Sequence, residues 1–346
     1  MDENTYIQDI LSQPAALLAA LDRFDLDPLR PYTRALRNGE YDRLILTGMG
    51  ASGYAAYPAW LQLLKAGFPA FWVDCAELSH YARPLITKRS FVWLISQSGR
   101  SAEILRLLDL MQATPPAAFI ATTNDLASPL AQAAGLTLLL EAAVEETVST
   151  RTYLNSLAIS QLVARALCLE DLDPDYYDLR KAADGIASYL ANWDEHLLTL
   201  EGLVGKPQHL LLVGRGPSMA AVLTGALIIG EAAKFPALAL NAAQFRHGPL
   251  EMAGSQLTVL VFGGPDETAA LNRHLLHELL GFGTAAFWLS PSPQGEIPAL
   301  PMPQASGIGL PLAEIVPVQL LSVNLARQTG HVPGKFLYSG KVTITE

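Results

Sequence analysis

An internal repeat is the feature that most constrains the fold of this chain. Residues 44–52 read Leu-Ile-Leu-Thr-Gly-Met-Gly-Ala-Ser, and residues 210–218 read Leu-Leu-Leu-Val-Gly-Arg-Gly-Pro-Ser. Phe-Pro-Ala follows in both copies, at residues 68–70 and 235–237. Each copy begins as a short apolar strand that stops at a glycine turn and continues as a helical pattern. The repeat therefore predicts two copies of one α/β unit.

Further apolar runs alternate with helical patterns in the first copy, and they predict strands at residues 70–73, 91–95, 117–122 and 136–140. Strands that alternate with helices at this spacing form a parallel sheet with helices on both faces. The expected fold class is α/β, with two doubly wound, flavodoxin-like parallel-sheet domains in tandem.

Prolines interrupt helical patterns near the start of the chain, and an acidic stretch, Glu-Asp-Leu-Asp-Pro-Asp at residues 170–175, marks a change of composition. These breaks predict the domain organisation. We expect a helical N-terminal arm (1–40), a first domain (41–170), a connecting helix (171–200), a second domain (201–330) and a C-terminal tail (331–346).

Composition excludes several classes of function. The 346 residues carry a net charge of −10 with the acids spread along the chain, so no basic face for nucleic acid is expected. Cys75 and Cys168 have neither disulfide nor metal-ligand spacing, and we expect both in the core. Residues 1–20 lack a secretory pattern, and no run of eighteen apolar residues occurs. We therefore expect a cytoplasmic protein with no membrane partner and no metal.

A polar loop at residues 96–101, Ser-Gln-Ser-Gly-Arg-Ser, lies between the predicted strand 91–95 and an amphipathic helix pattern. The start of a helix presents free backbone N–H groups, so such a loop can bind an anion. Gly99 permits close approach, and Arg100 offers a charge for a phosphate. An ordinary turn with a serine cap is the alternative. The second copy has Gly-Gly-Pro-Asp at 263–266, a poor phosphate partner, so the anion is expected in the first copy.

Four motifs occur in a characteristic order: the repeated Gly-x-Gly-x-Ser units, Ser-Gln-Ser-Gly at 96–99, Ser-Thr-Arg-Thr-Tyr at 149–153 and Arg-His-Gly-Pro-Leu at 246–250. Together they resemble the SIS (sugar isomerase) family, in particular the isomerase half of glucosamine-6-phosphate synthase and short glucosamine-6-phosphate deaminases. The resemblance implies a homodimer that uses no cofactor. It also implies sugar contact at Ser149 and a phosphate site made of Ser52, Ser96, Gln97, Ser98 and Ser101.

Three further residues are candidates for catalysis. Glu231 follows Leu223 and Leu227 at i+4 steps, so burial is expected to raise its pKa, although a carboxylate satisfied by Lys234 fits equally well. His247 precedes a Gly-Pro turn. The resemblance implies that Glu231 is the base, that His247 opens the sugar ring from the neighbouring chain, and that a C-terminal lysine covers the carbonyl or forms an imine with it. That lysine is Lys341.

The chain departs from the synthase pattern at three places. Ile228 replaces a second lysine, Arg100 replaces an acidic residue in the serine loop, and Val144 replaces a glutamate, with Glu145 and Glu146 adjacent. We expect the protein to act without the synthase's glutaminase domain and its N-terminal cysteine nucleophile. We therefore expect interconversion of glucosamine 6-phosphate with fructose 6-phosphate and free ammonia. A fructosamine-6-phosphate deglycase is the nearest alternative, and a non-catalytic sugar-phosphate-binding regulator is an alternative of another class.

Overall fold

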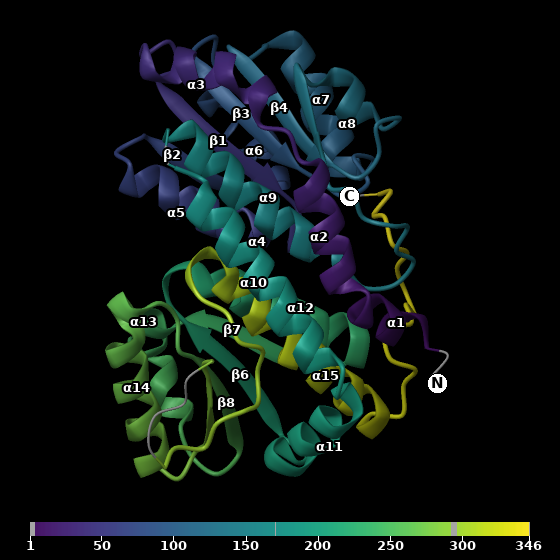
Figure 1. Cartoon of the computed structure of the whole chain (residues 1–346), viewed down its shortest axis with the longest axis vertical. Helices are drawn as coiled ribbons and strands as arrows, with labels where there is room; N and C mark the ends of the chain where they lie inside the picture. Colours follow the sequence, from purple (N-terminus) through teal and green to yellow (C-terminus); the bar gives the residue numbers. More distant parts are fainter. Residues whose placement is uncertain (1–3, 170, 292–295, 346) are drawn as a thin grey trace. The chain divides into compact units, whose positions relative to one another are not determined.

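The computed structural model describes residues 4–169, 171–291 and 296–345, so Glu170 of the predicted connection and Glu346 of the tail lie outside the described residues. The chain divides into two compact modules (Figure 1). The first module comprises Ala15–Glu145, Arg151–Tyr176 and Tyr338–Glu346, and the second comprises Met1–Pro14, Glu146–Thr150 and Tyr177–Leu337.

A five-stranded parallel sheet in the order β2-β1-β3-β4-β5 forms the centre of the first module. This is the flavodoxin-like order of a doubly wound sheet. Its strands are β1 (Arg43–Gly48), β2 (Ala70–Asp74), β3 (Ser90–Ile95), β4 (Ala118–Thr123) and β5 (Leu136–Leu139). Its helices are α2 (Gln13–Arg23), η1 (Asp27–Leu29), α3 (Arg30–Arg37), α4 (Gly50–Ala55), α5 (Tyr57–Lys65), α6 (Cys75–His80), η2 (Arg83–Leu85), α7 (Ala102–Ala113), α8 (Pro129–Ala133) and α9 (Arg151–Leu167).

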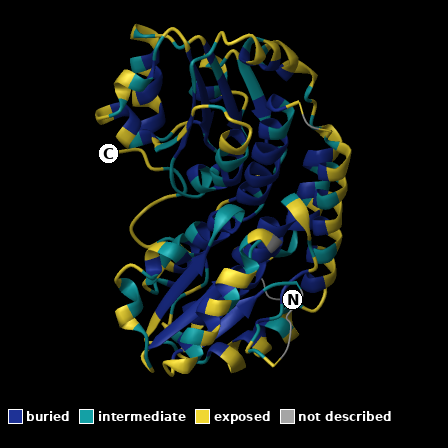
Figure 2. Cartoon of the chain, turned by 90° about the vertical axis from the view of Figure 1, so that its left-hand side faces the viewer, coloured by how far each residue is buried: buried dark blue, intermediate teal, exposed yellow. Residues whose placement is uncertain are grey.

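Side chains of the central strands alternate between two cores, one on each face of this sheet. Leu44 and Trp93 belong to one buried cluster, whereas Ile45 and Val92 belong to the other. Successive side chains of a strand point to opposite faces, so a strand that is covered on both faces has to be apolar throughout. β3 is buried along its whole length. In Figure 2, dark buried segments lie in the interior of each module and exposed segments lie at its surface.

The second module contains a four-stranded parallel sheet in the order β7-β6-β8-β9. This order repeats the first four strands of the first module and confirms the predicted repeat. Its strands are β6 (His209–Gly214), β7 (Ala237–Asn241), β8 (Leu257–Phe262) and β9 (Ala285–Leu289). Its helices are α1 (Thr5–Leu11), α10 (Asp173–Leu190, which begins in the first module), α11 (Trp193–Val204), η3 (Gly216–Ser218), α12 (Met219–Ala233), α13 (Ala242–Phe245), η4 (Pro249–Met252), α14 (Asp266–Gly281), η5 (Gly307–Gly309) and α15 (Leu310–Gln328).

Buried polar contacts fix the first helix of the chain to the second module. The hydroxyl groups of Tyr6 and Ser322 lie 2.9 Å apart, and the Gln13 and Gln319 amides exchange hydrogen bonds of 2.8 and 3.0 Å. All four side chains are buried. Such paired polar groups hold α1 and the first residue of α2 against α15 without leaving a donor or acceptor unsatisfied.

Two helical stretches of the second module, Gly216–Ala233 and Gly307–Gln328, are long and apolar enough to cross a membrane. Of these apolar windows, 61% and 89% of the residues are buried inside the structure. Core helices of globular domains have the same character, and such burial accounts for the apolar composition without a bilayer. Cys75 and Cys168 are buried in the two core clusters of the first module and form no disulfide bond, as predicted.

Candidate substrate site

The serine loop, residues 96–101, begins where β3 ends, beside the end of β1. These two strands are neighbours at the point where the strand order of the first sheet reverses. Ligands of doubly wound sheets bind in the crevice at this switch point. Ser52, which lies on α4 just after β1 and is partly exposed, belongs to the same edge. The fold therefore brings Ser52 and the serine loop to one edge of one sheet.

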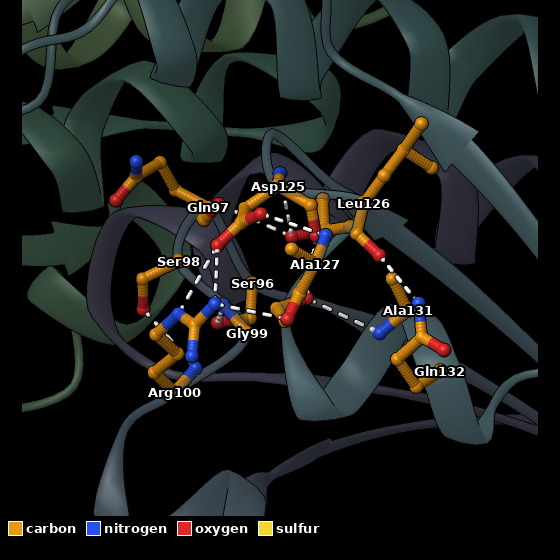
Figure 3. A network of polar contacts seen from close by, with 12 residues as sticks. Ser96, Gln97, Ser98, Gly99, Arg100, Asp125, Leu126, Ala127, Ala131 and Gln132 are labelled. Atoms are coloured by element: carbon orange, nitrogen blue, oxygen red, sulfur yellow. Dashed lines mark hydrogen bonds and ion pairs between the residues drawn. The ribbon is translucent and has the colours of Figure 1, made fainter.

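Two hydroxyl groups of the loop organise its backbone. The Ser96 hydroxyl accepts a hydrogen bond from the Gly99 N–H at 3.1 Å, and the Ser98 hydroxyl accepts one from the Arg100 N–H at 3.3 Å. A serine hydroxyl that accepts a hydrogen bond still has its own proton to donate. The side chain of Gln97 extends away from these contacts (Figure 3). The loop can therefore offer several donors to the oxygen atoms of a bound anion.

The loop conformation requires glycine at position 99. Gly99 has a φ of +61°, and a Cβ atom built on it lies only 2.5 Å from the Ser128 hydroxyl oxygen and 2.9 Å from the Leu130 Cβ. Both neighbours are anchored, because Ser128 caps α8 and Leu130 is fully buried. A side chain at this position would strain the backbone and displace the loop.

Arg100 is predicted to offer a charge to a phosphate, but the structure pairs its guanidinium with the carboxylate of Asp125. Its Nε and Nη2 atoms donate to one oxygen of Asp125 at 3.1 and 2.8 Å, and Nη2 also donates to the Ala127 carbonyl at 3.0 Å (Figure 3). The Arg100 guanidinium lowers the pKa of Asp125. Local sequence patterns do not reveal this partner, because Asp125 follows β4 and not the serine loop itself.

The C-terminal tail lies against this part of the first module. The Ala102 N–H, at the start of α7, donates to the Thr343 carbonyl at 3.0 Å. Lys341 Nζ donates to Glu145 Oε2 at 2.7 Å, and only 19% of the lysine side chain is exposed. The predicted lysine is therefore placed in the same module as the serine loop.

Glu145 is the carboxylate partner of Lys341. It is adjacent to Val144, which replaces the glutamate of the synthase pattern. Its side chain has no exposed surface, whereas Val144 is 83% exposed. The Thr152 hydroxyl donates to Glu145 Oε2 at 2.6 Å, and the Thr152 N–H lies 3.5 Å from Oε1. Thr152 is in the first turn of α9, where the helix dipole favours a negative charge. Lys341 and the helix terminus together compensate the burial of this carboxylate.

Glu231 lies in the last turn of α12, in the second module, and is partly exposed. The prediction that Glu231 lies on a buried face with Leu223 and Leu227 is wrong, because both leucines are also partly exposed. The helix α12 buries Ile228 and Ile229 instead. Position 231 is thus on the outer side of a core helix. Its backbone carbonyl accepts a hydrogen bond from Lys234 Nζ at 2.6 Å.

His247 and Ser149 also belong to the second module. His247 is exposed, and its N–H bonds to the Gln244 carbonyl at 3.0 Å. Gly248, with a φ of +125°, turns the chain directly after it. Ser149 is partly exposed. The structure therefore places Ser149, Glu231 and His247 in one module and the serine loop with Lys341 in the other.

The second module has a polar centre of its own at the matching strand ends. The Ser218 hydroxyl, aligned with that of Ser52, donates to Glu314 Oε1 at 2.9 Å. Glu314 is completely buried on α15, and burial raises its pKa to about 8. Sequence reasoning missed this residue, although a carboxylate inside the apolar stretch 310–326 is a signal that can be read from the sequence.

The described part of the chain contains no group of three or more His, Cys, Asp or Glu residues placed to hold a metal ion. The side chains gathered at the two edges are instead hydroxyl groups, amides, carboxylates and a lysine. Such groups bind oxygen-rich ligands and transfer protons.

The SIS domain family model matches residues 40–166 and 203–326. The chain belongs to the SIS domain family. A curated relative, the isomerizing glutamine–fructose-6-phosphate aminotransferase of Pectobacterium atrosepticum, is 26% identical over 340 residues, which cover 93% of this chain and 55% of that protein. This SIS chain thus spans about half the length of the curated relatives it matches.

Solved structures share the fold of this SIS chain. The C-terminal domain of glucosamine-fructose-6-phosphate aminotransferase from Francisella tularensis superposes with a TM-score of 0.82 at 20% identity, covering 99% of this chain and 98% of that one. Glucosamine-6-phosphate deaminase from Thermotoga maritima gives a TM-score of 0.77 at 18% identity and covers 99% of this chain and 100% of that one. These comparisons confirm the predicted tandem SIS architecture.

Proposed function

We propose that this SIS protein interconverts glucosamine 6-phosphate and fructose 6-phosphate with free ammonia. The substrate class follows the names of its relatives, which act on fructose 6-phosphate or glucosamine 6-phosphate. The observation that carries the proposal is in the first module. A loop of serine hydroxyls at the switch point lies beside a tail that bears a partly buried, carboxylate-bound lysine.

The phosphate is assigned to the serine loop. Ser96, Ser98 and Ser101 with Gln97 donate to its oxygen atoms, and Ser52 adds a donor from the end of β1. Hydrogen bonds to a charged acceptor are each worth about 1.5–3 kcal/mol. Arg100 has no part in this assignment, because Asp125 holds its guanidinium.

The chemistry is assigned to groups of the second module. His247 opens the sugar ring, and Ser149 contacts the sugar. Glu231 removes the proton from C2 of the open-chain aminoaldose and returns it to C1, so that C1 becomes an alcohol and C2 an imine. Water then adds to C2 and ammonia leaves, which gives fructose 6-phosphate.

Lys341 is assigned to the sugar carbonyl. A lysine acts as a nucleophile only after it loses a proton, and Glu145, 2.7 Å from its ammonium group, is a direct acceptor. The exposed position of His247 suits a residue that a homodimer donates to the site of its neighbour. We include this dimer in the proposal.

Ammonia release from glucosamine 6-phosphate by the purified chain tests the proposal, with fructose 6-phosphate measured in the same samples. Glu231→Gln is expected to abolish both products, and Glu201→Gln, an exposed change on α11, is the control. The proposal fails if neither product forms in either direction.

Two further assays separate the alternatives. A panel of fructosamine 6-phosphates tests for a deglycase, which would release the larger amine in preference to ammonia. Calorimetry tests for a regulator, which would bind hexose phosphates tightly without forming product. Analytical ultracentrifugation of the same samples tests the dimer.

A further inference from the structure

At the ends of β6 and β8 in the second module, the loops that follow these strands bind a carboxyl group of the protein itself. Ser218 follows the end of β6 and Gly264 follows the end of β8. Both loops send donors to Glu314 of α15. The Ser218 hydroxyl donates to Oε1 at 2.9 Å, and a backbone hydrogen bond from Gly264 reaches the same carboxyl group.

The two donors correspond to the positions assigned to phosphate in the first module. Ser218 aligns with Ser52, and Gly264 aligns with Gln97. Further polar atoms surround Gly264. A Cβ atom built there lies 3.3 Å from Thr268 Oγ1, 3.4 Å from Asn272 Nδ2 and 3.6 Å from Ser218 Oγ. The two crevices thus share their place in the fold and two of their donor positions.

The position of Glu314 is energetically unfavourable for a carboxyl group. Glu314 has no exposed surface, and it is the one carboxylate-bearing residue of α15 (Leu310–Gln328). Burial of a polar group costs free energy unless hydrogen bonds replace water. Apolar residues would pack there without this cost, so the carboxyl group requires a role that packing does not supply.

The protonation of Glu314 explains how one carboxyl group serves two donors. Burial raises its pKa to about 8, so near neutral pH the group is largely protonated. Oε1 accepts the hydrogen bond from Ser218, whereas Oε2 has no hydrogen-bond partner among the described residues and can carry the proton. The crevice thereby obtains an acceptor without a buried charge.

We propose that Glu314 is a built-in ligand of the second module, occupying with its carboxyl group the crevice that the first module leaves open for a substrate phosphate. The chain accordingly binds one sugar phosphate in the first module and none in the second. The comparison of the two crevices rests on the proposed function, but the contacts of Glu314 do not.

Chemical rescue tests whether the crevice is a ligand site. Glu314→Ala removes the acceptor and leaves space, and we expect Tm to fall by about 5–10 °C. Sodium acetate at pH 6 should then raise Tm of this variant by several degrees more than sodium chloride of equal ionic strength. The wild type and the double variant Ser218→Ala/Glu314→Ala should show no such excess.

A second measurement applies if Glu314→Ala does not fold. Glu314→Gln keeps an acceptor oxygen, whereas Glu314→Met keeps only the volume. Ser218→Ala should lower Tm in the wild type and in Glu314→Gln, but not in Glu314→Met. Equal stability of the Gln and Met variants, or no acetate excess in a folded Glu314→Ala, would overturn the proposal. These unfolding measurements contain no sugar, so their outcome is separate from turnover.

Discussion

The two modules have the same first four strands in the same order, yet opposite chemistry at their strand ends. The first module presents the hydroxyl groups of Ser96 and Ser98 on a glycine-bent loop. At the matching edge of the second module, Ser218 is already bonded to a buried carboxyl group, that of Glu314. One fold thus carries one edge whose serine hydroxyl groups can still donate hydrogen bonds and one edge whose serine already donates to a carboxyl group.

The difference shows how two copies of one unit can differ at their strand ends while the four shared strands keep the same order. Strand order and buried apolar runs are common to both copies, because the core requires them. The loops after β3 and β8 are free of that requirement and have diverged. The predictions below test the division of labour between the copies, beginning with the largest expected effect.

Replacement of Glu231 by Gln tests the chemical role of the second module. Loss of a general base typically lowers kcat by about 10²–10⁴-fold. We expect such a fall with little change in KM, because no donor to the phosphate is altered. Steady-state kinetics with glucosamine 6-phosphate measure both constants. A change in KM alone would show that Glu231 contributes to substrate binding and does not act as the general base.

Replacement of Ser96 or Ser98 by Ala tests the binding role of the first module. Each change removes one donor to a charged group, so we expect KM to rise about 10- to 100-fold with a smaller change in kcat. Ser188→Ala, on the exposed side of α10, is the matched control. The opposite pattern, a loss of kcat at unchanged KM, would contradict the division between the modules.

Sequence patterns predicted the parallel sheets because apolar periodicity is a local property. The strand at 91–95 and the serine loop after it needed no knowledge of distant residues. The carboxylate partners of Arg100 and Lys341 could not be predicted from local patterns. Asp125 lies after a different strand, and Glu145 becomes a partner only because the tail returns to the first module. Glu231 was misplaced for a related reason, since apolar spacing cannot tell which face of an apolar helix packs inward.

Replacement of Glu145 by Gln tests how the tail is held. The change leaves the Lys341 ammonium group without its carboxylate, and we expect a loss of about 1–3 kcal/mol in the free energy of unfolding. Hydrogen exchange of residues 338–345 should become faster. Lys341→Met serves as the reciprocal variant, and a double-mutant cycle between the two positions should reveal coupling. If the free-energy changes of the two single variants simply add in the double variant, the Glu145–Lys341 pair does not hold the tail.

The pH dependence of stability tests the internal acceptor of the second module. The pKa of Glu314 is raised from 4.5 to about 8 on folding, so between these values the folded state holds more protons than the unfolded state. The free energy of unfolding should therefore fall as pH rises through this window, by at most about 1.4 kcal/mol per pH unit.

Glu314→Gln removes this titration at nearly constant volume. Its Tm relative to the wild type should improve steadily from pH 5 to pH 8. Glu201→Gln, whose carboxylate is exposed, should show no such trend. Parallel curves for the wild type and Glu314→Gln would mean that the carboxyl group does not titrate with folding.

Arg100→Gln should have the smallest effect, although it changes a charge inside the serine loop. The side chains of Arg100 and Asp125 are 46% and 36% exposed, and an ion pair at such a surface contributes less than about 1 kcal/mol. Because the guanidinium is directed at Asp125, KM for the sugar phosphate should change less than threefold, and the stability difference should shrink in high salt. A rise in KM comparable to that of Ser96→Ala would show that the arginine leaves Asp125 when substrate binds. Phosphate binding by the first module would then depend on a positive charge as well as on hydroxyl groups. The first module would differ still more from the second, where the carboxyl group of Glu314 accepts the hydrogen bond of Ser218.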